Sequence, residues 1–395
     1  QREDIPIFDP IDEEGNFLNY MGFIAGMNIK DADKYIVQRL KEEQIMFHHE
    51  TVQHSYPFCW RTDTPLIYKP ISTWFVNVEA IKDQMTAHNK TVHWVPGHIR
   101  DGRFGKWLEN ARDWAISRNR FWGTPLPVWK SDDGDVWCIG SVAELQEVTG
   151  EKITDLHKHF VDPMVIERNG KSYRRVPEVL DCWFESGSMP YAQEHYPFEN
   201  KERFEDNFPA DFICEGLDQT RGWFYTLAVL GSALFDTPAF KNCVVNGLIL
   251  AEDGKKMSKR LKNYPDPNEM SKKYGADAIR LYMLNSPAVR GEDLRFSEKG
   301  LVETTRQQLL PLWNALVFLS TYAKIDGWEP SPVNLSVKNN NPMDRWIVSR
   351  LHKLIAEVQN EMDGYDLNRS VAPFVGFIDL LTNWYIRRSR RRFWK

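Results

Sequence analysis

The sequence has few cysteines, no long hydrophobic run and no strong excess of one charge. Its five cysteines are scattered and form no C-x-x-C pair, which argues against a zinc or redox motif and fits a reduced intracellular compartment. The longest nearly apolar run, residues 226–235, is about half of the ~20 residues that cross a bilayer, so we expect no membrane anchor. A formal net charge of −5 excludes a uniformly basic coat, and any nucleic-acid site must be local.

Several common catalytic motifs are also missing. No H-E-x-x-H, G-x-S-x-G or Walker-type G-x-x-x-x-G-K-[ST] occurs, so metalloprotease, serine hydrolase and P-loop functions lose their usual support. The composition is globular, with 42% hydrophobic and 27% charged residues, and 395 residues suffice for roughly two to three domains. The chain opens on Gln1 without an initiator methionine and stops at Lys395 inside an arginine-rich stretch, so we expect a fragment.

The hydrophobic pattern changes along the chain. Residues 1–68 mix turn material with one stretch of helical periodicity, which predicts an α+β segment with a helix over about 31–43. Residues 70–209 contain short apolar runs broken by Pro and Gly, which predicts loops and short strands. Beyond Asp277 apolar residues recur with the helical period, so we expect a helical bundle there.

The centre of the chain has the pattern of a strand–helix–strand unit. Short apolar runs at 212–214 and 243–250 flank a stretch of helical periodicity over about 219–235. Such a unit implies a parallel sheet with a right-handed crossover. Ligands are expected at the carboxyl ends of its strands.

A basic loop follows the second of these strands, with the sequence Gly254-Lys255-Lys256-Met257-Ser258-Lys259-Arg260. A glycine-led loop with several cations and a hydroxyl suits a polyphosphate whose negative charge grows as a bond breaks. The alternative is a solvated basic loop or a localisation patch. Its position after a buried strand favours the anion site.

The first of these strands ends in a group of polar residues. Glu215 lies next to Gly216, and a carboxylate at such an edge can accept hydrogen bonds from ribose hydroxyls or an amine. Asp218 could instead cap the following helix. Trp183 and Trp223 together could wall an apolar pocket, although core packing is the simpler interpretation of either one alone.

Two further stretches combine arginines with aromatic residues. Arg118 and Arg120 lie among aromatic residues in a pattern that can hold a phosphate backbone and stack a base, with a surface ion pair as the alternative. Arg387, Arg388 and Arg391 form a dense basic face at the end of an amphipathic helix. They could contact nucleic-acid phosphates or could be a solvated helix end.

These motifs together resemble one known family. Lys256-Met257-Ser258-Lys259-Arg260 resembles the KMSKS signature of class I aminoacyl-tRNA synthetases, with Arg in the last place. Four other stretches resemble isoleucyl-tRNA synthetases and occur in the same order along the chain as in that family. Their sequences are similar to those of the eukaryotic cytosolic branch. These stretches are residues 116–123, 181–187, 215–224 and 274–280. Valyl enzymes are similar across much of this layout but usually lack the Gln and the Arg-Gly-Trp run at their counterpart of residues 218–223.

The resemblance implies an α/β fold. It predicts the C-terminal half of a class I Rossmann-like parallel sheet, preceded by the end of an α+β or β-rich editing insertion and followed by an α-helical bundle. Its expected parts are the end of the editing insertion (1–68), the second half of the catalytic domain with the KMSKS loop (69–265), a stem-contact connecting segment (266–328) and the start of the helical anticodon-binding domain (329–395).

The resemblance also implies a reaction. Isoleucine and ATP would form isoleucyl-adenylate, and the acyl group would pass to the terminal ribose of tRNA(Ile), with editing of misactivated valine in the full-length enzyme. Mg²⁺ would accompany ATP, and no protein ligand for a metal is evident. A cytoplasmic location is expected, and membership of a multi-synthetase complex is left open. The alternatives are a non-catalytic tRNA-binding relic and a valyl-tRNA synthetase.

Residue roles follow from the same resemblance. Lys256 and Lys259 would stabilise the transferring phosphates, with Ser258 supporting the loop. The remaining roles are binding of ATP and the adenylate by Glu215, Gly216, Asp218, Gln219 and Lys259, the isoleucine pocket at Trp183 and Trp223, and tRNA contacts at Arg118, Arg120, Arg387, Arg388 and Arg391. The family's His-x-Gly-His motif is missing, since Pro96-Gly97-His98-Ile99 does not match it, so the isolated fragment is expected to be inactive.

Overall fold

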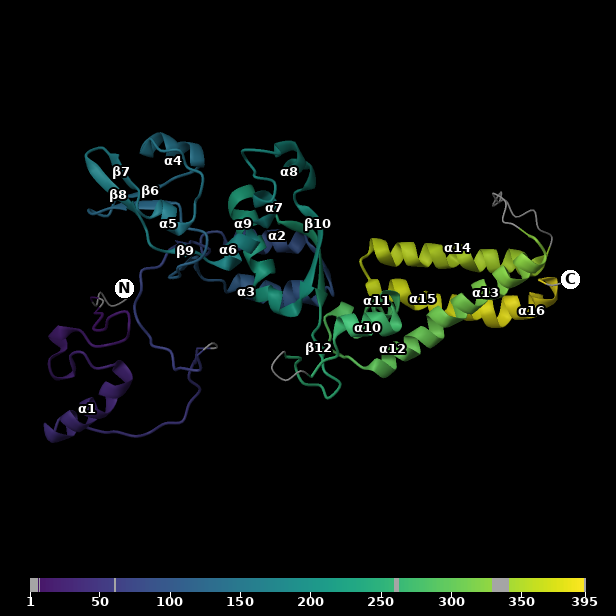
Figure 1. Ribbon diagram of the computed structural model, residues 1–395, viewed down its shortest axis with the longest axis horizontal. Helices are drawn as coiled ribbons and strands as arrows, with labels where there is room; N and C mark the ends of the chain where they lie inside the picture. Colours follow the sequence, from purple (N-terminus) through teal and green to yellow (C-terminus); the bar gives the residue numbers. More distant parts are fainter. Residues whose placement is uncertain (1–5, 7, 60–61, 259–262, 329–340, 394–395) are drawn as a thin grey trace. The chain divides into compact units, whose positions relative to one another are not determined.

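A computed structural model describes residues 6, 8–59, 62–258, 263–328 and 341–393 (Figure 1). The chain divides into two compact units, residues 1–74 and 75–395. The first unit thus ends slightly beyond residue 68, where the sequence placed the end of the first segment.

The first unit is built around helix α1 (Ile29–Glu42), which matches the helix expected over 31–43. The side chain of Asn28 accepts a hydrogen bond from the Lys30 backbone N–H and so caps the helix. A small apolar cluster surrounds Ala32 and includes Phe17. Among the described residues of this unit, β pairing is limited to isolated bridges, so the β-rich character expected here is not seen.

The second unit contains a three-stranded parallel sheet. Its order is β10 (Ala210–Gly216), β11 (Phe240–Asn246) and β2 (His93–Val95), and both neighbouring pairs are parallel. Helix α9 (Trp223–Phe235) connects β10 to β11. This confirms the strand–helix–strand unit and the parallel sheet that the sequence predicts.

The second predicted strand, over 243–250, is interrupted. β11 ends at Asn246, and Ile249–Leu250 form a separate strand, β12. β12 pairs in parallel with β13 (Leu294–Arg295) in a sheet of its own. The expectation of one continuous strand is therefore wrong.

Gly247 explains the interruption. Its N–H donates to the Ala288 carbonyl at 2.7 Å, and a Cβ placed on it would lie 1.8 Å from the Glu292 carbonyl oxygen. Only glycine allows two backbone segments to approach this closely. The chain leaves the parallel sheet at this contact.

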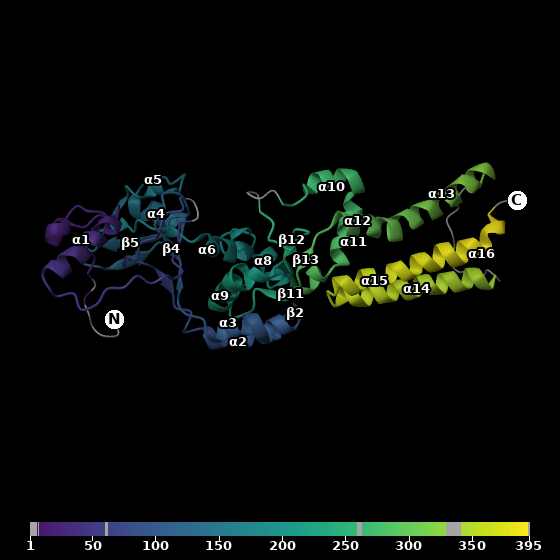
Figure 2. The same cartoon turned by 90° about the horizontal axis from the view of Figure 1, so that it is seen from below.

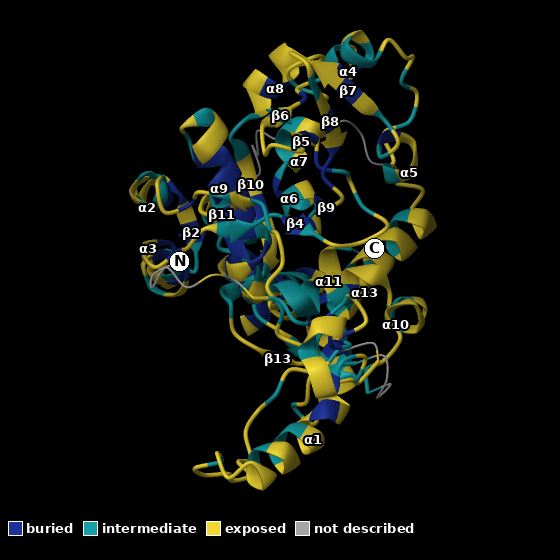
Figure 3. Cartoon of the chain, turned by 90° about the vertical axis from the view of Figure 1, so that its left-hand side faces the viewer, coloured by how far each residue is buried: buried dark blue, intermediate teal, exposed yellow. Residues whose placement is uncertain are grey.

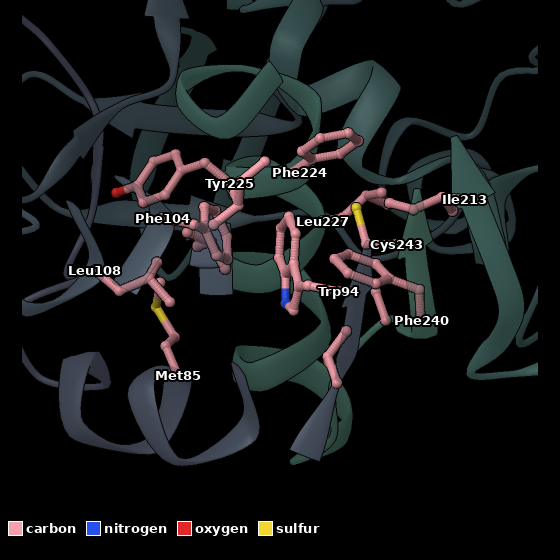
Figure 4. Packing of buried hydrophobic residues seen from close by; sticks show 14 of the residues in the cluster. Met85, Trp94, Phe104, Leu108, Ile213, Phe224, Tyr225, Leu227, Phe240 and Cys243 are labelled. Atoms are coloured by element: carbon pink, nitrogen blue, oxygen red, sulfur yellow. The ribbon is translucent and has the colours of Figure 1, made fainter. Parts of the chain in front are cut away.

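The core of the second unit is centred on Trp94 of β2 (Figure 4). Its ring lies 4.8 Å from Phe104, 5.8 Å from Phe224 and 6.1 Å from Phe240, measured between centroids. Its Nε1 donates to Asn89 at 3.0 Å, which satisfies the buried indole N–H. Each buried ring contributes roughly 1.5–3 kcal/mol. The sheet and α9 share this core, and Figure 3 shows the buried residues gathered along them.

A second, antiparallel sheet has its own small core around Trp129, Ile166 and Tyr173. Its strands, in spatial order, are β6 (Val136–Cys138), β5 (Val128–Ser131), β8 (Lys171–Arg175) and β7 (Val165–Arg168). The expectation of short strands within residues 70–209 is confirmed.

Short elements surround the two sheets. The helices are α2 (Lys82–Thr91), α3 (Gly105–Glu109), α4 (Val142–Thr149), α5 (Lys158–Val161), α6 (Cys182–Gly187), α7 (Met189–Ala192) and α8 (Lys201–Asn207). The two-stranded pairs are β1 (Phe75–Val76) with β3 (Trp114–Ala115), and β4 (Ser117–Arg118) with β9 (Val179–Leu180).

The remainder of the chain is helical, as its periodicity predicts. Helices α14 (Pro342–Asp363) and α15 (Leu367–Asp379) lie side by side in Figures 1 and 2. The apolar residues of α14 are not all covered, since Leu351 and Ile355 are exposed. The helices are α10 (Pro267–Tyr274), α11 (Ala276–Leu284), α12 (Glu298–Thr304), α13 (Leu310–Ile325), α14 (Pro342–Asp363), α15 (Leu367–Asp379) and α16 (Arg387–Ser389). Within the described ranges, none of the helices has the length and apolar character needed to span a bilayer.

Candidate active site

The carboxyl edge of the parallel sheet presents two carboxylates. Gly216, the last residue of β10, is in register with Asn246, the last residue of β11. The exposed Glu215 accepts a hydrogen bond from the Gly216 N–H at 3.1 Å. A Cβ on Gly216 would lie 2.7 Å from Asp218 Oδ1, so glycine is what lets that carboxylate fold back over the strand end. Negative charge therefore gathers where parallel sheets bind ligands.

Asp218 does not cap the helix, so the simpler alternative for this residue is wrong. A 3₁₀ turn over Leu217–Arg221 separates β10 from α9, and no side chain caps that turn. The Trp223 N–H at the start of α9 instead donates to Gln219 Oε1 at 2.8 Å. The capping role has moved to Gln219, and the exposed Asp218 carboxylate remains available to a ligand.

The two candidate pocket tryptophans both lie at the junction of α6 and α9. A Cβ on Gly222 would lie 3.1 Å from the Trp183 ring, so that ring rests on the residue preceding Trp223. Trp223 Nε1 donates to the Ser186 carbonyl at 3.0 Å. Trp183 is 40% exposed. This exposure disfavours pure core packing of Trp183, whereas Trp223 is partly buried and packs against the main core, as the simpler alternative predicts.

The basic loop folds back beside β12. Lys256 forms a bridge with Leu250, and the Ala251 N–H donates to the Lys255 carbonyl at 2.9 Å. Gly254 occupies the turn with φ of +80°, a conformation that favours glycine. Lys256 is exposed. The loop therefore presents Lys256 to solvent on a defined backbone.

Asn263 holds this loop in shape and was not singled out from the sequence. Its Oδ1 accepts from the Ser258 N–H at 2.9 Å, and its Nδ2 donates to the Lys256 carbonyl at 3.2 Å. Ser258 takes part in this contact only through its backbone N–H, so its role as a loop support stays a prediction. Lys259 lies outside the described residues. Asn is common in turns, but nothing in the sequence pairs this one with the loop.

Arg118 is bound within the fold. Its Nη2 lies 2.7 Å from Asp181 Oδ2, and its Nη1 donates to the carbonyls of Ala115 and Ser117. Asp181 is buried and also accepts a hydrogen bond from the Trp183 N–H at the start of α6. The structure thus places Arg118 in the ion pair that was the alternative to a nucleic-acid contact.

Arg120 lines a cavity of about 690 Å³ with Trp122 and His157. The Trp122 and His157 rings are stacked with centroids 4.7 Å apart, and His157 Nδ1 lies 2.6 Å from Asp155. Cys182 also lines this cavity. Burial, with a smaller contribution from the charge of Asp181, raises the pKa of its thiol, which makes it a poor nucleophile at neutral pH.

The C-terminal arginines are exposed. Arg387, Arg388 and Arg391 face solvent, and the Arg388 guanidinium lies 4.6 Å from the centroid of Trp384. Their neighbour Arg392 instead pairs with the buried Asp344 at 2.7 Å through Nη2. Three of the five arginines predicted to contact tRNA therefore form one accessible face, remote in sequence from the other two.

The described residues contain no group of three or more His, Cys, Asp or Glu side chains that could hold a metal ion.

Comparison with known proteins identifies the family to which the chain belongs. A profile of tRNA synthetases class I (I, L, M and V) matches residues 19–296. The chain belongs to this family. A profile of the anticodon-binding domain of tRNA ligase matches residues 344–395 of this class I chain.

Its sequence is similar to isoleucine–tRNA ligases. It is 62% identical to that of Protochlamydia amoebophila over 385 residues, which cover 98% of this chain and 37% of the relative. It is 59% identical to that of Chlamydia abortus over 391 residues, which cover 99% and 38%. The chain thus spans less than two fifths of the length of these curated relatives. Both are bacterial, so they give no support to the expected eukaryotic cytosolic branch.

Solved structures of two other synthetases share the fold. Mycobacterium tuberculosis methionyl-tRNA synthetase in complex with methionyl-adenylate has a TM-score of 0.59 at 20% identity, covering 85% of this chain and 56% of that one. Agrobacterium radiobacter K84 LeuRS in a ternary complex with tRNA and LeuAMS has a TM-score of 0.53 at 19% identity, covering 75% and 39%. The synthetase chain described here therefore has the class I α/β fold.

Proposed function

We propose that the chain is part of an isoleucine–tRNA ligase. In the complete enzyme the carboxylate of isoleucine would attack the α-phosphate of ATP, which forms isoleucyl-adenylate and releases pyrophosphate. The acyl group would then pass to the terminal ribose of tRNA(Ile), which releases AMP. One observation supports this most directly. The carboxylates of Glu215 and Asp218 follow β10, and the basic loop around Lys256 comes after its parallel neighbour β11 by way of β12. The carboxyl ends of such parallel strands are where a nucleotide would bind.

The charges of this edge suit an aminoacyl-adenylate. Glu215 and Asp218 would accept hydrogen bonds from the ammonium group and the ribose hydroxyls, next to Gly216, which allows close approach. Lys256, with Lys259 from the same motif, would stabilise the negative charge that grows on the phosphates as pyrophosphate leaves. The enzyme needs no covalent intermediate, because positioning and charge stabilisation lower the barrier.

The amino acid would lie at the α6–α9 junction. Trp183 and Trp223 would wall its side chain, while Gln219 would hold the start of α9 in place. A hydrophobic pocket separates isoleucine from valine by a single methylene, which is worth only about 1–3 kcal/mol. Editing of valine would therefore be needed, and we assign it to parts of the enzyme outside the site described above.

Recognition of tRNA would use positive charge in two places. Arg387, Arg388 and Arg391 would contact phosphates from the C-terminal helices, and Arg120 would do so beside the Trp122–His157 stack. Arg118 would support this second site through its ion pair with Asp181. Mg²⁺ would bind with ATP. We also propose a cytoplasmic location and leave membership of a multi-synthetase complex as a hypothesis.

Isoleucine-dependent ATP–pyrophosphate exchange by the complete gene product tests this function. We expect exchange with isoleucine to exceed exchange with valine by roughly 100-fold, in line with one methylene of discrimination. The Lys256→Ala substitution should abolish most of the isoleucine-dependent exchange. Lys241→Ala is the matched control, because Lys241 lies at the opposite end of β11 and pairs with Asp211 at 3.0 Å.

Three results would refute the proposal. A preference for valine would make the enzyme a valyl-tRNA synthetase. Absence of exchange with retained tRNA binding would make it a non-catalytic tRNA-binding protein. Equal losses of exchange activity in the Lys256→Ala and Lys241→Ala variants would refute the role of the basic loop in the reaction.

A further inference from the structure

Arg295 lies beside the basic loop although 39 positions of sequence separate it from Lys256. Leu250 of β12 pairs with Arg295 of β13 on one side and forms the bridge with Lys256 on the other. Residues directly paired across strands project their side chains to the same face. Lys256 and Arg295 therefore flank Leu250 on one face of this small sheet.

The Arg295 guanidinium lies against the loop. A Cβ on Gly254 would be 3.1 Å from Arg295 Nε and 3.2 Å from its Cζ, so the guanidinium occupies the space that a side chain at position 254 would fill. Gly254 has a positive φ as well. The turn at Gly254 thus leaves room for the cationic side chain of Arg295, which comes from another segment of the chain.

The backbone around Arg295 is firmly held. The Leu294 N–H donates to the Leu248 carbonyl and the Phe296 N–H to the Leu250 carbonyl, both at 2.9 Å. Leu294 is buried. Arg295 therefore projects from an anchored strand, and little backbone ordering would be needed to use it.

Among the residues that the structure describes, no acidic side chain pairs with Arg295. Lys255 of the loop, in contrast, lies 3.4 Å from Asp253. Arg295 and Lys256 start roughly 10 Å apart at the backbone, two strand spacings. Both side chains are long and exposed, so they can converge on one anion with several charges.

We propose that Arg295 is a third polyphosphate-binding residue, which acts with Lys256 on the phosphates of ATP. This proposal rests on the proposed function. Arginine presents paired N–H donors that match two phosphate oxygens, which a lysine at the same place cannot do. The contact of Arg295 with Gly254 also makes the position of its guanidinium depend on the shape of the loop.

The test measures ATP–pyrophosphate exchange by the complete gene product at saturating isoleucine. Arg295→Ala should lower kcat/KM for ATP by about 10- to 100-fold, the loss expected for a charge-assisted hydrogen bond. Arg295→Lys should recover part of this loss. Arg280→Ala is the matched control, because Arg280 is also exposed and pairs with Asp277 at 3.3 Å on α11. The KM for isoleucine should change less than twofold in all three variants.

A second readout measures binding alone. Inorganic tripolyphosphate should inhibit exchange competitively with ATP, and Arg295→Ala should weaken this inhibition by the same factor as it lowers kcat/KM. A purely structural role for Arg295 would not produce this proportionality. Unchanged ATP kinetics, or equal losses for ATP and isoleucine, would overturn the proposal.

Failure of the proposed function would be recognised separately. If the unsubstituted protein showed no isoleucine-dependent exchange, the assignment of the reaction would fall. Calorimetric binding of tripolyphosphate would then still decide the role of Arg295, because weaker binding by Arg295→Ala than by Arg280→Ala supports an anion site and equal binding refutes it.

Discussion

The ring of Trp183 rests on Gly222, where any side chain would meet it. A Cβ at this glycine would lie 3.1 Å from Trp183 Cη2 and 2.7 Å from Gln219 Oε1. The same Gln219 oxygen accepts the hydrogen bond from the Trp223 N–H. The absence of a side chain at Gly222 therefore allows both the packing of the Trp183 ring against this residue and the capping of α9 by Gln219.

Gly222→Ala should damage the amino-acid pocket more than the nucleotide site. The new methyl group displaces the Trp183 ring and the Gln219 cap, so we expect a loss of stability of about 1 kcal/mol and a roughly tenfold higher KM for isoleucine. Exchange kinetics and urea unfolding of the complete gene product measure the two effects. Gly102→Ala is the control, since a Cβ there meets nothing within 4 Å. A rise confined to the KM for ATP would contradict this account.

Gly247→Ala should be among the most destabilising single substitutions in the chain. The new Cβ would overlap the Glu292 carbonyl, and both partners are backbone, so one segment must move. We expect a loss of more than about 3 kcal/mol, measured by urea unfolding. Gly376→Ala is the control, because Gly376 is exposed within α15 and nothing lies within 4 Å of its Cβ position. That variant should gain up to about 1 kcal/mol from helix propensity, and similar effects of both changes would exclude the clash.

Local periodicity was enough to predict the main elements. The strand–helix–strand unit from β10 to β11 follows from apolar runs that are continuous in sequence, and a crossover through a helix implies parallel pairing of the two strands. The break at Gly247 could not be predicted in this way. It depends on the approach of Glu292, a residue 45 positions further along the chain.

The residues of the candidate site likewise fall into those that the sequence predicts and those that only the fold brings to the site. The basic loop and the Glu215–Gln219 stretch are visible in sequence because their residues are adjacent. The choice of helix cap was not, since Asp218 and Gln219 are both able to cap and the intervening 3₁₀ turn decides between them. Arg295 escaped notice because only the fold brings it to the loop. Asn263 is only five positions beyond Ser258, but nothing in the sequence indicates that its side chain binds the loop backbone.

Arg118→Ala should reduce stability, whereas Arg120→Ala should reduce tRNA binding. Removal of Arg118 leaves the buried Asp181 carboxylate without its 2.7 Å partner. Since Arg118 itself is part exposed, we expect a loss of about 1–3 kcal/mol in urea unfolding. Arg120→Ala should stay within about 0.5 kcal/mol of the parent. Filter binding of tRNA to both variants completes the comparison, and a stable Arg118 variant with weakened tRNA binding would return Arg118 to the nucleic-acid surface.

Asn263→Ala should slow the chemical step without changing the affinity for isoleucine. This side chain forms two hydrogen bonds to the loop backbone, at Ser258 and at Lys256, and each contributes roughly 0.5–1.5 kcal/mol to the loop conformation. If that conformation places Lys256 against the leaving pyrophosphate, kcat for exchange should fall about tenfold. Asn110→Ala is the matched control, because Asn110 also donates to a lysine carbonyl, at 2.8 Å, but at the end of α3. An equal fall of kcat in both variants would show that loss of such a hydrogen bond acts through general stability. An unchanged kcat in Asn263→Ala would show that the loop keeps its conformation without the Asn263 side chain.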